Sequence, residues 1–147
     1  MYNRILLTAF VAWFLAQLSK TVIYAIINKK FSWERFRGDG GMPSSHSAVV
    51  ASVATITGLQ LGWDSPLFAI AAILAMIVMH DATGVRQETG KQAKVINNML
   101  KLFESMGRGE LTPEETLKEF VGHTRRQVTV GAVYGILIGI IMNGILP

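Results

Sequence analysis

Four long apolar segments divide the chain, and they lie at about 5–27, 44–61, 66–82 and 128–146. A membrane-spanning helix needs about 20 residues, with about 17 at the lower end. The third segment has no polar face between Phe68 and Met79, whereas helices of soluble bundles alternate polar and apolar faces. We therefore expect an all-α, polytopic membrane helix bundle with about four transmembrane helices. Residues 1–147 would form a single integral-membrane domain.

The first segment also has the outline of a secretory signal peptide, because Arg4 precedes the apolar run. No small-x-small cleavage site follows it, so we expect a retained helix.

Residues 87–121 carry a different pattern and predict an extramembrane helical hairpin. Apolar side chains recur there at three- and four-residue steps, at Ile96, Met99, Phe103 and Met106, with lysines between them. Thr112 and the Pro-Glu-Glu that follows it are typical of the start of a second short helix. This amphipathic insert would either pack on the bundle or lie as a lid in the headgroup layer.

The charges predict how the bundle is oriented. Residues 28–40 hold four basic residues and 83–127 hold eight, whereas the link 62–65 has none. The positive-inside rule makes the two basic loops cytoplasmic and puts both termini outside. The net charge of +4 suits loops beside an anionic plasma or inner membrane, and no basic tract with interleaved aromatics indicates nucleic-acid binding. The chain has no cysteine, so disulfides are excluded.

The start of the second apolar segment is the first candidate site. A glycine-rich stretch and Pro43 lead into Ser44, Ser45 and His46. Unpaired N–H groups and the positive end of the helix dipole favour an anion at such a helix start. The alternative is that the serines serve only as helix caps.

The predicted topology brings other polar groups to the same cytoplasmic face. They are His80, Asp81 and Arg86 at the end of the third helix, His123, Arg125 and Arg126 at the start of the fourth, and Lys20 about 10 Å deeper on the first. Lys20 either serves the site or snorkels to the interface. Asp81 either orients a histidine or pairs with Arg86, whose planar fork suits phosphate.

The last helix carries two structural signals. Thr124 with Gln127 three residues later predicts a capping box. Gly131, Gly135 and Gly139 are four residues apart, which lets another helix approach closely in lipid. The partner would be a helix of this chain or of a second copy, and we expect a homodimer.

Three motifs carry a resemblance to a known family. They are Gly-Gly-Met-Pro-Ser-Ser-His-Ser-Ala, then His80-Asp81-Ala82-Thr83-Gly84-Val85-Arg86, then Gly122-His123-Thr124. In order and context they resemble the divergent membrane branch of the type 2 phosphatidic-acid phosphatase superfamily, labelled acid phosphatase/vanadium-dependent haloperoxidase-related. The superfamily hydrolyses phosphate esters through a phosphohistidine without metal or cofactor, and its motifs are Lys-x6-Arg-Pro, Pro-Ser-Gly-His and Ser-Arg-x5-His-x3-Asp.

The resemblance implies a role for each matching residue. Pro43, Ser44 and His46 match the second motif, with Ser45 in place of glycine, which implies phosphate contacts there and His46 as proton donor to the leaving group. For the first motif, Lys30 and Arg37 have the right separation, but Gly38 follows in place of proline, so Lys20 is an alternative cation.

The third motif departs most from the family pattern. His123 would be the nucleophile, but Leu117 stands where its arginine is expected, so Arg86 would supply the charge. Gln127 stands where the family has the orienting aspartate. An amide brings no charge to stabilise the imidazole on attack. Either Asp81 substitutes for the carboxylate, or turnover is weak, or phosphoryl transfer is not the function.

Three functions remain open. The leading hypothesis is an integral-membrane phosphatase that hydrolyses a lipid or isoprenoid phosphate at the cytoplasmic face, with catalytic His123, His46 and Asp81 and with phosphate bound by Ser44, Ser45, Arg86, Lys20, Lys30 and Arg37. The second is a non-enzymatic phospholipid or anion binder or transporter that uses the same site. The third is a metal-dependent hydrolase with His46, His80, Asp81 and His123 as ligands, a set that suits zinc but lacks any short metal-ligand spacing.

Overall fold

The computed structural model describes residues 3–29, 41–106, 117 and 123–146, and leaves the side chains of residues 86 and 87 undescribed. These parts form helices, without a strand among them. The helices are α1 (Arg4–Asn28), α3 (Ser45–Leu61), α4 (Pro66–Thr83), α5 (Val85–Ser105) and α6 (Arg125–Ile145). The predicted all-α fold is confirmed.

The helix starts follow local capping signals in the sequence. Asn3 accepts a hydrogen bond from the Leu6 N–H at the start of α1, and Ser65 does the same for Phe68 at the start of α4. Helix α6 begins three residues before the predicted start at residue 128, because the Thr124 capping box adds a polar first turn to the apolar segment.

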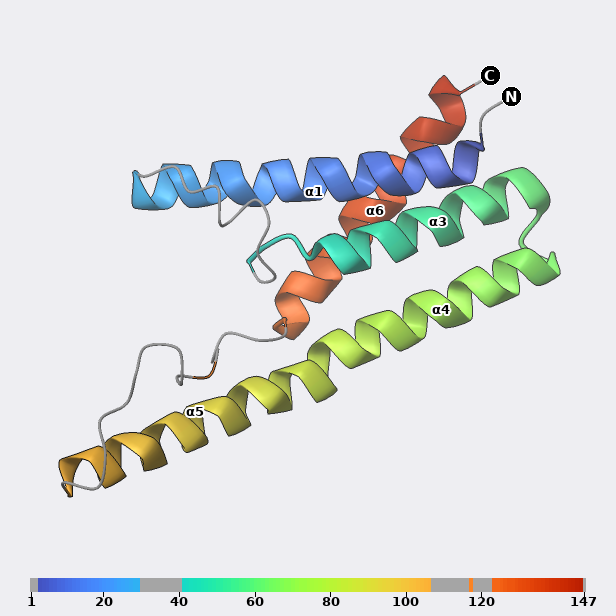
Figure 1. Ribbon diagram of the computed structural model, residues 1–147. Coiled ribbons are helices and arrows are strands. Elements are labelled where there is room, and N and C mark those ends of the chain that lie inside the picture. The colour runs from blue at the N-terminus through green and yellow to red at the C-terminus, as the bar shows by residue number, and fades with distance from the viewer. Residues whose placement is uncertain (1–2, 30–40, 107–116, 118–122, 147) are drawn as a thin grey trace.

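Helix α3 lies at the centre of the bundle and packs against α1, α4 and α6. Helices α1 and α3 run side by side in opposite directions (Figure 1). As a result, the starts of α3 and α6 and the end of α4 gather at one end of the bundle (Figure 1). The helix ends that the predicted topology brings to one face therefore lie together in the structure.

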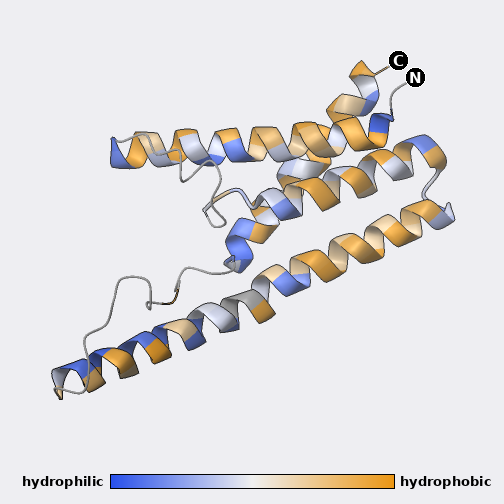
Figure 2. Ribbon diagram, viewed as in Figure 1, coloured by the Kyte–Doolittle hydropathy of each residue, from blue (hydrophilic) through white to orange (hydrophobic). Residues whose placement is uncertain are grey.

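The bundle is packed as membrane proteins are, with small residues inside and large apolar residues outside. The largest fully buried side chains are Ile56, Thr8, Ser44, Ser47 and Ser52. Large apolar side chains such as Phe10, Ile70 and Ile140 are more than half exposed on the outer faces, and the outer helices are mostly apolar along their length (Figure 2). Lipid rather than water suits such a surface.

Within the described residues, three helical stretches are long and apolar enough to cross a membrane: Arg4–Asn28, the stretch Pro66–Ser105 that combines α4 and α5, and Arg125–Ile145. The remaining predicted span, residues 44–61, corresponds to α3. This helix has 17 residues, which is the lower end of the range for a span. Its central position surrounds it with the other helices.

Helix α5 continues almost in line from α4 and projects beyond the bundle (Figure 1). The break falls at Gly84, whose N–H donates to the His80 carbonyl. Polar and apolar residues alternate around α5 (Figure 2), so the predicted first helix of the insert is amphipathic and begins at residue 85. The predicted second helix of the hairpin, at about 112–121, lies outside the described residues apart from Leu117.

The glycine stripe of α6 packs against α3 of the same chain. A Cβ at Gly131 would lie 2.5 Å from the Ser44 carbonyl oxygen, and a Cβ at Gly135 would collide with the Ala48 carbonyl. Gly139 faces Thr55 in the same way, at 2.8 Å. Of the two partners considered for this stripe, the structure shows the one within the chain. A homodimer would need a different surface.

Candidate phosphate site at one end of the bundle

The site is built around the first residues of α3. Ser44 is the N-cap, and its Oγ accepts hydrogen bonds from the Ser47 N–H at 3.4 Å and from the Ser47 hydroxyl at 3.0 Å. Ser44 is fully buried and Ser45 nearly so, whereas His46 is exposed. Pro43 precedes the cap and lies outside the first turn. The capping role considered for the serines is thus realised at Ser44.

The second part of the site is His123, which the fold places next to His46. The His123 backbone N–H donates to the Ala82 carbonyl at the end of α4, over 3.0 Å. The two imidazole rings have centroids 6.3 Å apart and are tilted by 52°. His123 is only 5% exposed, and its Nδ1 is shut off from solvent. A buried imidazole just before α6 and an exposed imidazole in the first turn of α3 therefore face one small region.

Gln127 joins the start of α6 to the start of α3. Its side-chain Oε1 accepts a hydrogen bond from the Thr124 N–H at 3.0 Å, and its own N–H donates to the Thr124 hydroxyl. The predicted capping box is confirmed. In addition, the Gln127 carbonyl accepts a hydrogen bond from the Ser44 N–H at 3.2 Å. This second link was not predicted, although Gly131, which lets Ser44 approach closely, was the available signal.

Lys20 reaches the same region from α1. Its side chain is 3% exposed, and its stem lies against Gly41, where an added Cβ would be 3.1 Å from the lysine Cγ. Gly41 has a φ of +90°, which disfavours any other residue. Of the two roles considered for Lys20, burial beside the glycine-rich stretch fits service to the site better than extension toward water.

The structure describes Asp81, but it describes only some of the basic residues that were predicted to lie near it. Asp81 is half-buried and directly precedes Ala82, the residue that holds His123. His80 is exposed in the last turn of α4. Arg86 lies in the first turn of α5, but its side chain is outside the description, as are the predicted phosphate ligands Lys30 and Arg37. Which partner Asp81 serves therefore stays a prediction.

Two helix N-termini point at this region, those of α3 and α6 (Figure 1). Unpaired N–H groups and the positive dipole end favour an anion at each of them. The described residues hold no group of three or more His, Cys, Asp or Glu side chains arranged to hold a metal ion. The arrangement therefore suits a small tetrahedral anion between two imidazoles, with a buried lysine close by.

Comparisons with known proteins agree with the order of the motifs. The model of a family described as the divergent PAP2 family matches residues 1–138. The chain is 39% identical over 148 residues to the uncharacterized membrane protein YuiD of Bacillus subtilis (strain 168), covering 95% of this chain and 94% of the relative. No solved structure matches this chain.

Proposed function

This chain belongs to the divergent PAP2 family, and on that premise we propose that it is an integral-membrane phosphatase that hydrolyses a lipid or isoprenoid phosphate at the cytoplasmic face. The observation that carries the proposal is the pair of imidazoles, His46 and His123, with centroids 6.3 Å apart. His46 lies in the first turn of α3 and His123 two residues before α6. Two backbone hydrogen bonds hold these segments in place, from the His123 N–H to the Ala82 carbonyl and from the Ser44 N–H to the Gln127 carbonyl. One phosphoryl group could contact both rings.

Each imidazole takes the role that its surroundings allow. Because the Nδ1 of His123 is enclosed, its Nε2 would attack phosphorus, forming an N–P bond while the P–O bond to the leaving group breaks. His46, which is exposed on the solvent side, would give its proton to the leaving oxygen. Water, deprotonated by His46, would then cleave the phosphohistidine to release inorganic phosphate and restore both rings.

The anionic oxygens would be stabilised by fixed positive groups. Lys20 lies buried beside Gly41, and the N-termini of α3 and α6 add partial positive charge. Such groups act most strongly where water is excluded. Asp81 would orient an imidazole, and Arg86, Lys30 and Arg37 would complete the cationic surroundings.

The test is phosphate release by the purified protein in detergent or liposomes. Phosphatidic acid and an isoprenyl monophosphate serve as substrates, with a chelator present throughout. The His123→Ala variant should lose turnover by at least about 10³-fold and His46→Ala by about 10²- to 10⁴-fold. His80→Ala, an exposed imidazole two residues before Ala82, should leave turnover unchanged. Full activity in His123→Ala would overturn the mechanism.

The same experiment distinguishes the metal-free mechanism from the metal-dependent alternative. If a zinc ion held by His46, His80, Asp81 and His123 carried the reaction, the chelator would abolish turnover and His80→Ala would lower it. Turnover that survives the chelator in the wild type would exclude that alternative.

One observation favours the non-enzymatic alternative, a phospholipid or anion binder on the same site. The Gln127 side chain is engaged with the Thr124 N–H, so it does not orient His123 as the carboxylate of the wider superfamily would. A binder would take up vanadate in calorimetry, lose that binding in Arg86→Ala, and release no phosphate from any substrate tested. Clear turnover would remove this alternative.

A further inference from the structure

Helix α5 presents an apolar face that nothing in the described chain covers. The side chains on this face are 43–62% exposed, and they are Val95, Ile96, Met99, Leu102, Phe103 and Met106. Single exposed apolar residues are common, but six on one helical face outside the bundle form a patch of the kind that marks an interaction site.

The opposite side of α5 already has a partner within the chain. Ala93 and Asn97 are buried. The Asn97 side chain donates to the Leu117 carbonyl at 2.8 Å and accepts from the Leu117 N–H at 3.0 Å. Leu117 therefore lies on this side, and the exposed apolar face points away from it.

The spacing of the exposed face is that of a coiled coil. Steps of four and three residues alternate along the whole helix, at Val85, Thr89, Gln92, Ile96, Met99, Phe103 and Met106. This register puts Thr89, Ile96 and Phe103 at heptad position a, with the others at d. A groove of about 360 Å³ lined by Lys91, Gln92, Val95 and Ile96 opens on the helix.

The positions that flank this seam suit contact with an identical helix. From Val95 onward they are Val95, Leu100 and Leu102, none of them charged, so two copies would bring no like charges together. Lys94 and Lys101 fall at the outermost position f.

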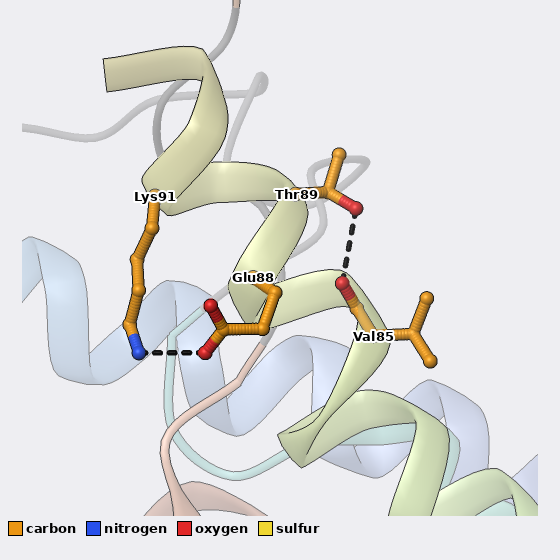
Figure 3. A network of polar contacts seen from close by, with 4 residues as sticks. All are labelled: Val85, Glu88, Thr89 and Lys91. Atoms are coloured by element: carbon orange, nitrogen blue, oxygen red, sulfur yellow. Dashed lines mark hydrogen bonds and ion pairs between the residues drawn. The ribbon is translucent and has the colours of Figure 1, made fainter. Parts of the chain in front are cut away.

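In the first turns of α5, polar side chains near the seam make contacts within their own helix. The Lys91 ammonium pairs with the Glu88 carboxylate at 2.7 Å, and the Thr89 hydroxyl donates to the Val85 carbonyl (Figure 3). The polar groups of Glu88, Thr89 and Lys91 are thus satisfied within their own helix, and Thr89 at position a would bring no unpaired donor into a contact.

The bilayer is too far away to cover this face. Helix α5 continues the direction of α4 (Figure 1), so at about 1.5 Å per residue Ile96 lies about 20 Å and Phe103 about 30 Å beyond Thr83. A tilt of up to about 40° reduces these heights by about a quarter. The headgroup layer is only about 5–8 Å thick per leaflet, so most of the face stands in water.

We propose that α5 is the dimerisation element of this protein and pairs with α5 of a second copy as a parallel two-stranded coiled coil. Two copies inserted in one membrane with the same orientation project their α5 helices in the same direction, which makes the pairing parallel. The proposal is independent of the proposed reaction and assigns the expected homodimer to a surface other than the glycine stripe.

Cysteine cross-linking in native membranes tests the register, because the chain has no cysteine of its own. Met99→Cys places one thiol at position d, and Lys101→Cys places one at position f of the same exposed turn. After oxidation, Met99→Cys should give a covalent species of twice the 16.1 kDa chain mass, and Lys101→Cys should stay monomeric. Adding Phe103→Glu to Met99→Cys should lower the cross-linked yield by at least about tenfold, whereas adding Lys94→Glu should not.

The other outcomes would overturn the proposal. Equal cross-linking at both positions would indicate random collision, and no cross-linking at either would indicate that α5 does not pair. A bimane probe on Met99→Cys that is quenched by nitroxide-labelled lipid would show that the bilayer covers the face. An unchanged yield with Phe103→Glu would place the contact elsewhere.

Discussion

At the residue scale, Gln127 serves two neighbours with different groups. Its side-chain oxygen closes the capping box with Thr124, and its carbonyl accepts the Ser44 N–H. The first contact could be predicted, since a capping box depends on residues three apart in the sequence. The second had only an indirect signal in Gly131, which indicates that another segment approaches α6 closely. That signal does not identify Ser44 as the partner, because Ser44 is 83 positions away from Gln127.

Replacing Gln127 tests whether its side chain is part of the chemistry. Gln127→Glu keeps an acceptor for the Thr124 N–H, since glutamate also suits a capping box. We expect stability to be unchanged and turnover to stay within about threefold of wild type. Gln127→Ala removes the acceptor and should lower the free energy of unfolding by about 0.5–2 kcal/mol. Thermal unfolding in detergent and phosphate-release rates measure the two effects. A large rate gain in Gln127→Glu would mean that the new carboxylate leaves the capping box and reaches His123.

Lys20 is the residue whose surroundings the sequence predicted least. Its place on a membrane helix predicted either function or snorkelling. Its burial against Gly41 depends on how the folded chain packs, so the sequence alone does not show it.

Neutralising Lys20 should weaken anion binding. Lys20→Met keeps most of the volume but removes the charge, and a hydrogen bond to a charged group of this kind corresponds to about a 10- to 100-fold change in affinity. Vanadate titration followed by calorimetry measures this loss. Lys29→Met, at the exposed end of α1, is the matched control and should bind as the wild type does. An equal loss in both variants would mean that Lys20 acts only through the general positive charge of the protein.

At the element scale, the contact between α3 and α6 decides where the site residues meet. The glycine spacing predicted close helix packing but not the identity of the partner, because the same stripe suits a helix in either copy. The structure shows α3 as the partner, with Gly131 against Ser44 and Gly135 against Ala48. The close approach is also what lets the Ser44 N–H reach the Gln127 carbonyl.

A methyl group at Gly135 should therefore force the two helices apart. We expect Gly135→Ala to lower the stability by about 1–3 kcal/mol, as overpacking does in other well-packed interiors, and to reduce anion binding as the start of α3 shifts. Gly144→Ala is the matched control on the same helix, because nothing lies within 4 Å of its added Cβ. Thermal unfolding of both variants in one detergent provides the comparison. A neutral Gly135→Ala would show that α3 and α6 are packed less tightly than the structure indicates.

At the scale of the whole molecule, the hydrophobic pattern predicted the all-α class and the positions of the long helices, because the bilayer imposes both length and polarity on a span. It could not predict that α5 would continue α4 with only Gly84 between them, since periodicity does not report direction. Nor could it show that α3, which at 17 residues is short for a span, would lie at the centre of the bundle and pack there through small and hydroxyl-bearing residues.

The orientation of the bundle is the last prediction, and it decides which compartment supplies the substrate. In the sequence, the basic segment 28–40 leads toward the start of α3 and the basic segment 83–127 follows the end of α4, and these two helix ends lie near the imidazoles. The positive-inside rule predicts that this end of the bundle faces the cytoplasm. Single-cysteine variants test this directly. In intact cells a membrane-impermeant maleimide should label Asp64→Cys, in the short connection at the opposite end, and should label Lys101→Cys on α5 only after the cells are opened. The reverse pattern would place the site outside. The protein would then act on phosphates of the outer leaflet, and its basic residues would face away from the leaflet that normally attracts them.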